Sequence, residues 1–292
     1  MNDIVNQQTV YLNGEYLPMM ESQISTQDRG FLFGDGVYEV IPVYAKKLFC
    51  FTEHLQRLKN SLKATSISNP HTDNEWQKIL QTLVNQHEWQ DQFIYLQVTR
   101  GVQMQRDHMP ADCLTPTVYA YTNPLKPVAD EIKKNGIKVV TLDDIRWLRC
   151  DVKAITLLPN VMLKLAAKSH GADDAILITK KGYVSEGTAS NAFIVKENTL
   201  ITPPNGQKIL PGITRLVLER LAKEHHIEWY ERQITETELL NANEIWLSSS
   251  TKEALPVCYL NGQAIGSGKP GPLWQKMHQI YQNHKEAFIN QA

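Results

Sequence analysis

Alternating and amphipathic patterns fill the first 120 residues. TVYLNGEYLP predicts a hairpin around Asn13-Gly14, and VYEVIPVYAKKLFCF predicts a second one. EHLQRLKNSLKA and EWQKILQTLVNQHE carry apolar residues at helical spacing, and the later runs FIYLQVTRG and TPTVYAYT have the pattern of strands. Because these strands pair mainly through hairpins, we expect a largely antiparallel sheet with helices on one face.

The second half of the chain mixes strands and helices in a different order. GIKVVTLDD predicts a strand, VMLKLAA a helix, and AILITKKGYVSEG and NAFIVKENTLITPP further strands. A Pro211-Gly212 turn leads into a clear helix, and EIWL predicts a strand followed by a serine-rich loop. The chain ends in an amphipathic helix. These patterns together predict the α+β class.

A short proline-containing segment divides the two halves. TNPLKPVADE holds two prolines beside polar residues, which is typical of a linker. We therefore expect a small N-terminal α+β domain at 1–122, a linker at 123–128 and a larger C-terminal domain at 129–292.

Composition and charge exclude several classes of partner. The 292 residues carry a net charge of -1, and no run of basic residues offers an electrostatic basis for binding nucleic acid or a membrane surface. No stretch approaches the roughly 20 apolar residues of a membrane span, and the N-terminus lacks the pattern of a signal peptide. A cytoplasmic location is therefore expected. The four cysteines show no metal-ligand spacing, so we expect no metal site.

One lysine stands out because its neighbours are apolar. Lys164 lies within Val161–Ala167, and Glu186 follows in the turn SEGTASN. A lysine that loses hydration there would give up its ammonium form more easily and become a nucleophile for Schiff-base chemistry. The structural alternative is that the Lys164 side chain lies at the polar edge of its helix and extends its charge into water.

Three segments offer groups for an anion. Gly212 to Arg215 begin a helix whose first amides are unpaired, although such a turn also serves as a simple cap. The run Ser248 to Thr251 offers hydroxyls and amides, as would an ordinary polar loop. Arg57 suits a bidentate phosphate contact or an exposed helix face.

A fourth segment suits a carboxylate. Arg106 and His108 are spaced i and i+2 in the loop QMQRDHMP, so in extended backbone both side chains project to one side. Tyr38 could add a phenolic donor. A buried lysine, a carboxylate, phosphate-binding groups and a carboxylate grip are together the parts of a pyridoxal phosphate site.

At this point the sequence resembles a known family, the class IV aminotransferases, also called fold-type IV pyridoxal phosphate enzymes. Within that family it is closest to the D-amino acid aminotransferases of bacteria. The resemblance runs from about Tyr11 to the C-terminal helix. It rests on the motifs FGDGVYEV, EHLQRL, YLQVTRG with RDH, DIRWLRCDVK, LPNVMLKLAA, SEGTASN and LPGITR.

The resemblance implies a two-domain fold whose C-terminal, cofactor-binding domain is a mixed α/β, barrel-like structure, and a homodimer. Lys164 would form the Schiff base, and Glu186 would pair with the pyridine nitrogen. The phosphate would be bound by Arg57, Ile213, Thr214 and Ser250. The substrate would be bound by Tyr38, Arg106, His108, Ser249 and Thr251, with Arg106 and His108 reaching in from the partner subunit.

The implied reaction transfers the amino group of D-alanine or a similar donor to 2-oxoglutarate, giving D-glutamate. Alternatives of the same fold are a branched-chain L-amino acid aminotransferase and a lyase acting on an aminodeoxychorismate-like substrate. A binding module without turnover is a further alternative. Lys252 and Ala189 depart from the expected small polar residues and bear on substrate range.

Overall fold

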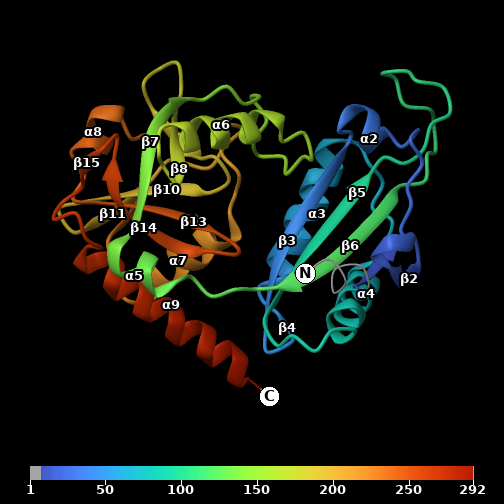
Figure 1. Ribbon diagram of the computed structural model, residues 1–292, viewed down its shortest axis with the longest axis horizontal. Coiled ribbons are helices and arrows are strands. Elements are labelled where there is room, and N and C mark those ends of the chain that lie inside the picture. The colour runs from blue at the N-terminus through green and yellow to red at the C-terminus, as the bar shows by residue number, and fades with distance from the viewer. Residues whose placement is uncertain (1–7, 292) are drawn as a thin grey trace. The chain divides into compact units, whose positions relative to one another are not determined.

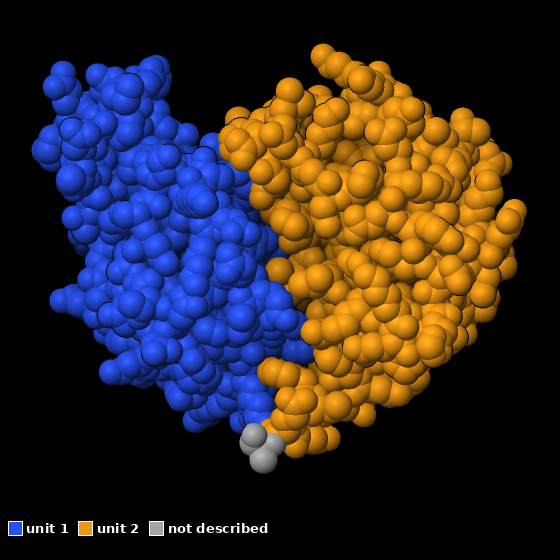
Figure 2. Space-filling model, turned by 180° about the vertical axis from the view of Figure 1, so that it is seen from behind, with its two compact units in different colours: residues 1–126, 152–156 blue, residues 127–151, 157–292 orange. Residues whose placement is uncertain are grey.

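The computed structural model describes residues 8–291, which form two compact units. Unit 1 comprises residues 8–126 together with Val152–Thr156, and unit 2 comprises Pro127–Asp151 and the chain from Leu157 onward (Figure 2). The first boundary falls within the expected linker. The expected second domain at 129–292 needs one correction, because Val152–Thr156 belongs to unit 1, where Ala154 pairs with Val37.

Unit 1 is a six-stranded antiparallel sheet in the order β2-β1-β6-β5-β3-β4, covered by helices (Figure 1). The two predicted hairpins are confirmed by the pairs β1/β2 and β3/β4. Its elements are β1 (Thr9–Leu12), β2 (Glu15–Pro18), η1 (Met19–Glu21), α2 (Arg29–Phe33), β3 (Gly36–Tyr44), β4 (Lys47–Leu48), α3 (Phe51–Ala64), α4 (Asp73–Asn85), β5 (Gln92–Thr99) and β6 (Thr117–Pro124).

The core of unit 1 lies on one face of this sheet. Alternate strand residues such as Val37 and Leu96 point to this face and pack against α3 and α4, whose Leu58 and Trp76 are buried. The residues between them point to the opposite face, where Tyr38 and Tyr95 stack at 5.7 Å. The sheet therefore presents a helix-covered apolar face and a half-buried aromatic one.

Unit 2 is built on a nine-stranded mixed sheet in the order β12-β11-β10-β13-β14-β7-β8-β9, with β15 paired to β14. Parallel pairs join β11 to β12, β14 to β7 and β7 to β8. The α+β class is confirmed. The elements are α5 (Asp130–Asn135), β7 (Ile137–Asp143), α6 (Leu158–Ser169), β8 (Asp174–Ile178), β9 (Val184–Gly187), β10 (Asn191–Lys196), β11 (Thr199–Thr202), α7 (Ile213–Glu224), β12 (Trp229–Glu231), α8 (Glu236–Leu240), β13 (Glu244–Ser249), β14 (Glu253–Leu260), β15 (Gln263–Ala264) and α9 (Pro272–Asn290).

Strand β8 separates two layers of unit 2. Ile176 and Ile178 point into the main core of the unit, whereas Ala175 and Leu177 face α6. Such strands are apolar throughout because both faces are covered. Within residues 8–291, no helix has the length and hydropathy that a membrane span requires.

Candidate active site

Lys164 lies on the outer side of α6 and is hydrated. Its side chain is 46% exposed, and Nζ lies 3.1 Å from Oδ2 of Asp174 and donates to the carbonyl of Asp173 at 2.5 Å. The helix turns Leu163 and Ala167 into the core instead. The expected burial of Lys164 is therefore wrong. Its apolar sequence neighbours are distributed around the helix, and several of them are themselves exposed.

A different lysine, Lys153, lies in Val152–Thr156, the short segment that belongs to unit 1 although unit 2 precedes and follows it in sequence. The amide of Tyr38 in β3 donates to the Lys153 carbonyl at 2.9 Å, and the Lys153 amide donates to Oγ of Ser61 at 3.2 Å. The half-buried Lys153 side chain places Nζ 4.1 Å from the centre of the Tyr38 ring. Within residues 8–291, no carboxylate pairs with Nζ. The sequence signal for Lys153 was its position as the last residue of DIRWLRCDVK.

Glu186, at the end of β9, is a buried carboxylate in unit 2. Arg146 donates to Oε1, and Oε2 accepts from Nδ2 of Asn191 at 3.1 Å and from the amide of Leu210 at 3.0 Å. Burial raises the pKa of the Glu186 carboxyl, and the Arg146 guanidinium partly offsets that rise. Unit 2 thus holds a buried acid whose ionised form is favoured mainly by Arg146 and further by the amide of Leu210.

Arg146 is fixed by a second acid, Asp144. Nε and Nη2 of Arg146 donate to the two carboxylate oxygens of Asp144 at 2.9 and 2.8 Å. Oγ of Ser185 donates to the same carboxylate at 2.6 Å. Sequence reasoning missed Arg146, although it lies in DIRWLRCDVK, because nothing in the pattern distinguishes it from the partly exposed Arg149 of the same motif.

Asn191 connects Glu186 to the start of α7. Nδ2 of Asn191 also donates to the carbonyl of Leu210 at 2.9 Å, and a Cβ at Gly212 would lie only 1.9 Å from Oδ1 of Asn191. Gly212 caps α7 without a side-chain hydrogen bond, and the first turn of the helix contains no acidic residue. The amides of Ile213 and Thr214 therefore begin the helix without a capping side chain, as an anion site requires.

The serine run lies at the end of the strand that pairs with Asn191. Ser248 in β13 is the cross-strand partner of Asn191, and its buried hydroxyl has no hydrogen-bond partner within residues 8–291. Ser249 ends β13, and the half-buried Ser250 and Thr251 form the turn to β14. Glu186, the start of α7 and the serine run are therefore neighbours within unit 2.

Arg57, on α3 in unit 1, is buried beside another acid. Its Nε and Nη2 donate to the two oxygens of Glu39, each at 2.7 Å, and Nδ1 of His54 lies 2.8 Å from Oε2 of Glu39. Burial alone would raise the pKa of Glu39, but Arg57 and His54 outweigh it and lower the pKa to about 2. Glu39 uses two of the five N–H groups of the guanidinium. The surface alternative for Arg57 is excluded.

The loop between β5 and β6 presents Arg106 and His108 together. Both side chains are exposed, and both approach the ring of Phe33: the Arg106 guanidinium carbon lies 4.8 Å from the ring centre, and the His108 ring lies at 5.5 Å. The expectation that the two side chains share one side of the loop agrees with this geometry. Tyr38 belongs to the same unit, on β3.

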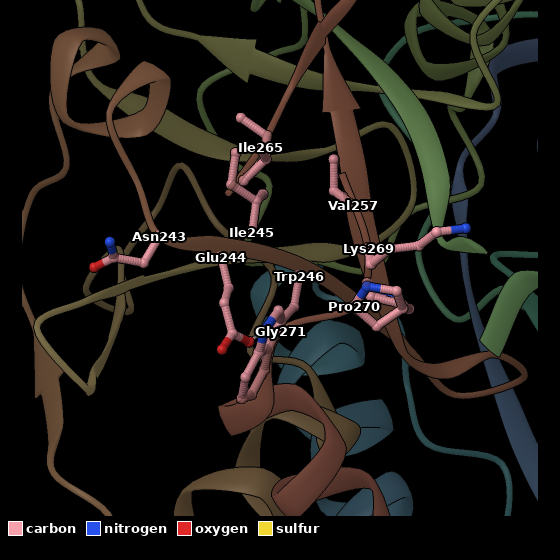
Figure 3. Close-up of a pocket in the computed structure, with 10 residues that line it drawn as sticks. Asn243, Glu244, Ile245, Trp246, Val257, Ile265, Lys269, Pro270 and Gly271 are labelled. Carbon is pink, nitrogen blue, oxygen red and sulfur yellow. Dashed lines mark hydrogen bonds between the residues drawn. The ribbon is translucent and has the colours of Figure 1, made fainter. Parts of the chain in front are cut away.

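A small pocket elsewhere in unit 2 has a structural explanation. Figure 3 shows Glu244 directed toward the start of α9. Its carboxylate accepts from the amides of Leu273 and Trp274 at 2.9 Å each, and from Nε1 of Trp246 at 3.0 Å. Glu244 is therefore a buried helix cap, and none of the predicted site residues lines this pocket.

Comparisons with known proteins identify the family to which the chain is similar. Residues 36–260 match the family model for class IV aminotransferases. The chain is 42% identical to a D-alanine aminotransferase of Bacillus licheniformis, over 94% of this chain and 96% of the relative. It is 36% identical to a D-alanine aminotransferase of Staphylococcus aureus, over 95% of this chain and 98% of that one.

Among solved structures, a branched-chain amino acid aminotransferase of Escherichia coli is similar with a TM-score of 0.89 and 25% identity, covering 95% of this chain and 94% of that chain. The family match spans both units and includes Glu186, Asn191 and the start of α7. On these grounds the chain belongs to the class IV aminotransferases and is a pyridoxal phosphate-dependent aminotransferase.

Proposed function

We propose that the enzyme transfers the amino group of D-alanine, or a similar D-amino acid, to 2-oxoglutarate, giving D-glutamate. The observation that carries this proposal is the loop that presents Arg106 and His108 beside one aromatic ring. A guanidinium and an imidazole side by side suit the α-carboxylate of an amino acid. The D-alanine aminotransferases among the relatives, at 36 to 42% identity, support the same substrate class.

The described residues fit the expected cofactor. In unit 2, the start of α7 at Ile213 and Thr214 has no capping side chain and so suits the phosphate. The buried hydroxyl of Ser248 nearby has no hydrogen-bond partner within residues 8–291 and could bind a further polar group. Ser250, on the adjacent turn, would add a hydroxyl. In unit 1, Arg57 would add charge to the phosphate site. Glu186 offers a buried acceptor for the protonated pyridine nitrogen.

When bound, pyridoxal phosphate supplies an electron sink that stabilises negative charge at the substrate Cα. The ionised Glu186 would accept a hydrogen bond from the protonated ring nitrogen and so keep the proton there, and Arg146 favours the ionised form of Glu186. Lys153 takes over the role that the sequence assigned to Lys164. Its Nζ would hold the cofactor covalently and then accept the proton that leaves Cα. Lys153 is half-buried and unpaired by a carboxylate within the described part of the chain, whereas Lys164 is hydrated and paired with Asp174.

The carboxylate grip would decide which enantiomer reacts. With the proton acceptor fixed on one side, the position of the substrate carboxylate sets which Cα–H bond points toward the amine. Tyr38, Arg106 and His108 are our proposed carboxylate ligands, and Ser249 and Thr251 our proposed further substrate contacts. Lys252 and Ala189, both exposed, would affect the range of side chains accepted and leave the reaction unchanged.

We further propose that the enzyme is a homodimer in which Arg106 and His108 serve the partner subunit. Four apolar side chains of one helix support an interface between copies, because a monomer rarely exposes such a group. They are Leu158, Val161, Met162 and Leu165, all on α6 and all more than half exposed. Light scattering of the holoenzyme would show a mass of about 67 kDa, twice the 33.3 kDa of one chain, and a monomer would contradict the proposal.

A test with two enantiomers separates the D-specific proposal from the branched-chain L-specific alternative. The alternative is relevant because a branched-chain amino acid aminotransferase has a similar fold. The absorbance of the cofactor-loaded enzyme is recorded before and after D-alanine, and separately L-leucine, with no acceptor present. We expect D-alanine alone to bleach the cofactor band. Bleaching by L-leucine alone would assign the enzyme to branched-chain L-amino acids. A lyase would release its product without needing any 2-oxo acid acceptor.

A further inference from the structure

A buried arginine, Arg29, binds the backbone of the loop that carries Arg106 and His108. Arg29 begins α2 and is 4% exposed. Its Nη1 donates to the carbonyl of Asp107 at 2.6 Å, and its Nη2 donates to the carbonyl of His108 at 2.9 Å. Asp107 lies between the two proposed carboxylate ligands, Arg106 and His108, and His108 is one of them. One guanidinium therefore fixes the backbone on which the grip is built.

Arg29 is itself fixed by an acid. Its Nε donates to Oδ2 of Asp35 at 2.8 Å, and Arg100 donates to both oxygens of the same carboxylate at 2.7 and 2.9 Å. Arg100 also donates from Nη2 to the carbonyl of Thr65 and from Nη1 to the carbonyl of Ser66. Both arginines pair with Asp35, but within residues 8–291 only the Arg29 side chain donates to the carbonyls of Asp107 and His108.

Phe33 completes the support from the same helical turn. Arg29 and Phe33 are spaced i and i+4, so their side chains lie on one face of α2. The guanidinium carbons of Arg29 and Arg106 each lie 4.8 Å from the centre of the Phe33 ring, and the His108 ring lies at 5.5 Å. The side chains of Arg106 and His108 thus both contact the Phe33 ring, which restricts their positions.

Gln103 closes the loop at its base. Its Oε1 accepts from the amide of Ala111 at 2.8 Å and from Nη1 of Arg29 at 3.4 Å, and its Nε2 donates to the carbonyl of Gln105 at 3.0 Å. The loop has exposed side chains and an internally bonded backbone. Such a segment is ordered before a substrate arrives.

We propose that Arg29 and Phe33 are positioning residues that preorganise the carboxylate grip and thereby set the affinity for the substrate carboxylate. The inference rests on the proposed function, since it takes Arg106 and His108 as carboxylate ligands. A preformed loop spares the substrate the ordering cost that a mobile loop would impose on binding. Lysine cannot replace Arg29, because one ammonium cannot span Asp35 and two carbonyls in the fixed directions of a guanidinium.

The test compares Arg29→Lys and Phe33→Leu with the control Arg100→Lys, which keeps charge and removes the other arginine of the Asp35 pair. In the holoenzyme we expect Arg29→Lys to raise KM for D-alanine roughly tenfold or more, with a much smaller change in kcat. Phe33→Leu should shift KM in the same direction. The half-reaction with ethylamine, which has no carboxylate, should slow no more in these two variants than in the control.

Hydrogen exchange of residues 103–109 gives a readout that does not depend on the reaction. We expect faster exchange in Arg29→Lys and unchanged exchange in Arg100→Lys. Equal KM changes in Arg29→Lys and the control, or equal losses with D-alanine and ethylamine, would overturn the inference. If the wild-type enzyme fails to react with D-alanine, the proposed function falls, and the exchange data still decide whether Arg29 orders the loop.

Discussion

The ammonium of Lys153 lies 4.1 Å from the centre of the Tyr38 ring. The two residues belong to segments far apart in sequence, joined by the hydrogen bond from the Tyr38 amide to the Lys153 carbonyl. The ring gives the ammonium a defined position, and within residues 8–291 no carboxylate pairs with it. That position places a lysine and a proposed substrate ligand side by side.

Replacing Lys153 by Ala should reduce turnover roughly a thousandfold or more, because both the covalent link and the proton acceptor are lost. The matched control is Lys164→Ala, which removes an exposed ion pair worth about 1 kcal/mol or less and should keep near-normal turnover. Borohydride reduction of the holoenzyme followed by peptide mass analysis should find the cofactor on the peptide containing Lys153. Label on Lys164 would reverse the assignment.

Arg146→Met should slow catalysis at least about tenfold near neutral pH and make it pH-dependent. Burial raises the pKa of Glu186, and without Arg146 the main effect that opposes this rise is lost. Glu186 is then protonated and can no longer accept a hydrogen bond from the protonated ring nitrogen. Activity should therefore recover as the pH is raised and Glu186 ionises. The kcat profile from pH 6 to 9 is the measurement.

Arg149→Met is the control for that experiment, since Arg149 is partly exposed and pairs with Asp151 instead. It should leave the profile as in the wild type. A flat profile in Arg146→Met that parallels the control would mean that Arg146 has no influence on Glu186 during the reaction.

Acid should destabilise unit 1 through Glu39. Its pKa falls from an ordinary 4.5 to about 2, because Arg57 and His54 outweigh the effect of burial. A lowered folded-state pKa stabilises the fold fully above about pH 4.5, and this contribution is lost as the pH falls toward about 2. Glu39→Gln should lower the free energy of unfolding at pH 7 by about 3–5 kcal/mol, because the buried Arg57 loses the carboxylate with which it pairs.

Urea unfolding at pH 7, 4 and 3 measures this contribution, because it is lost between about pH 4.5 and pH 2. The wild type should lose stability more steeply than Glu39→Gln as the pH falls. Parallel losses in both proteins would place the acid sensitivity in other carboxylates.

Gly212→Ala should weaken cofactor binding about tenfold or more. The backbone angles of Gly212 suit alanine, but the added Cβ would lie 1.9 Å from Oδ1 of Asn191 and displace the side chain that joins Glu186 to the start of α7. Gly206→Ala is the control, because a Cβ there meets no atom within 4 Å. Titration of the apoprotein with pyridoxal phosphate compares the two. Equal affinities would contradict the role of Asn191.

Periodicity predicted the elements well where local pattern decides them. The Asn13-Gly14 hairpin forms because both residues adopt positive φ, and the helices α3 and α4 follow their apolar spacing. Glu186 was identified from the motif SEGTASN, which was expected to be a turn, although the residue itself lies in strand β9. The expected linker contains the boundary at Lys126.

Burial of single polar residues was not predictable in the same way. Lys164 looked buried because its neighbours in sequence are apolar, but a helix distributes neighbours around its axis, and only tertiary packing decides which side faces the core. Arg146 and Arg149 are three residues apart in irregular chain, where no period marks the inner one. Arg29 follows the N-cap of a five-residue helix, and its bonds to the loop 78 and 79 residues later leave no trace in local pattern.

The return of Val152–Thr156 to unit 1 means that the polypeptide changes unit at three peptide bonds rather than one. The proposed reactive lysine, Lys153, therefore belongs to unit 1 and pairs with its strand β3, although the residues before and after its short segment belong to unit 2. Neither unit can be expressed, or exchanged with that of a relative, as one uninterrupted gene fragment without separating Lys153 from β3. Recombination within this family should accordingly tolerate crossovers near Lys126 only when both parents share compatible residues at 36–38 and 152–156.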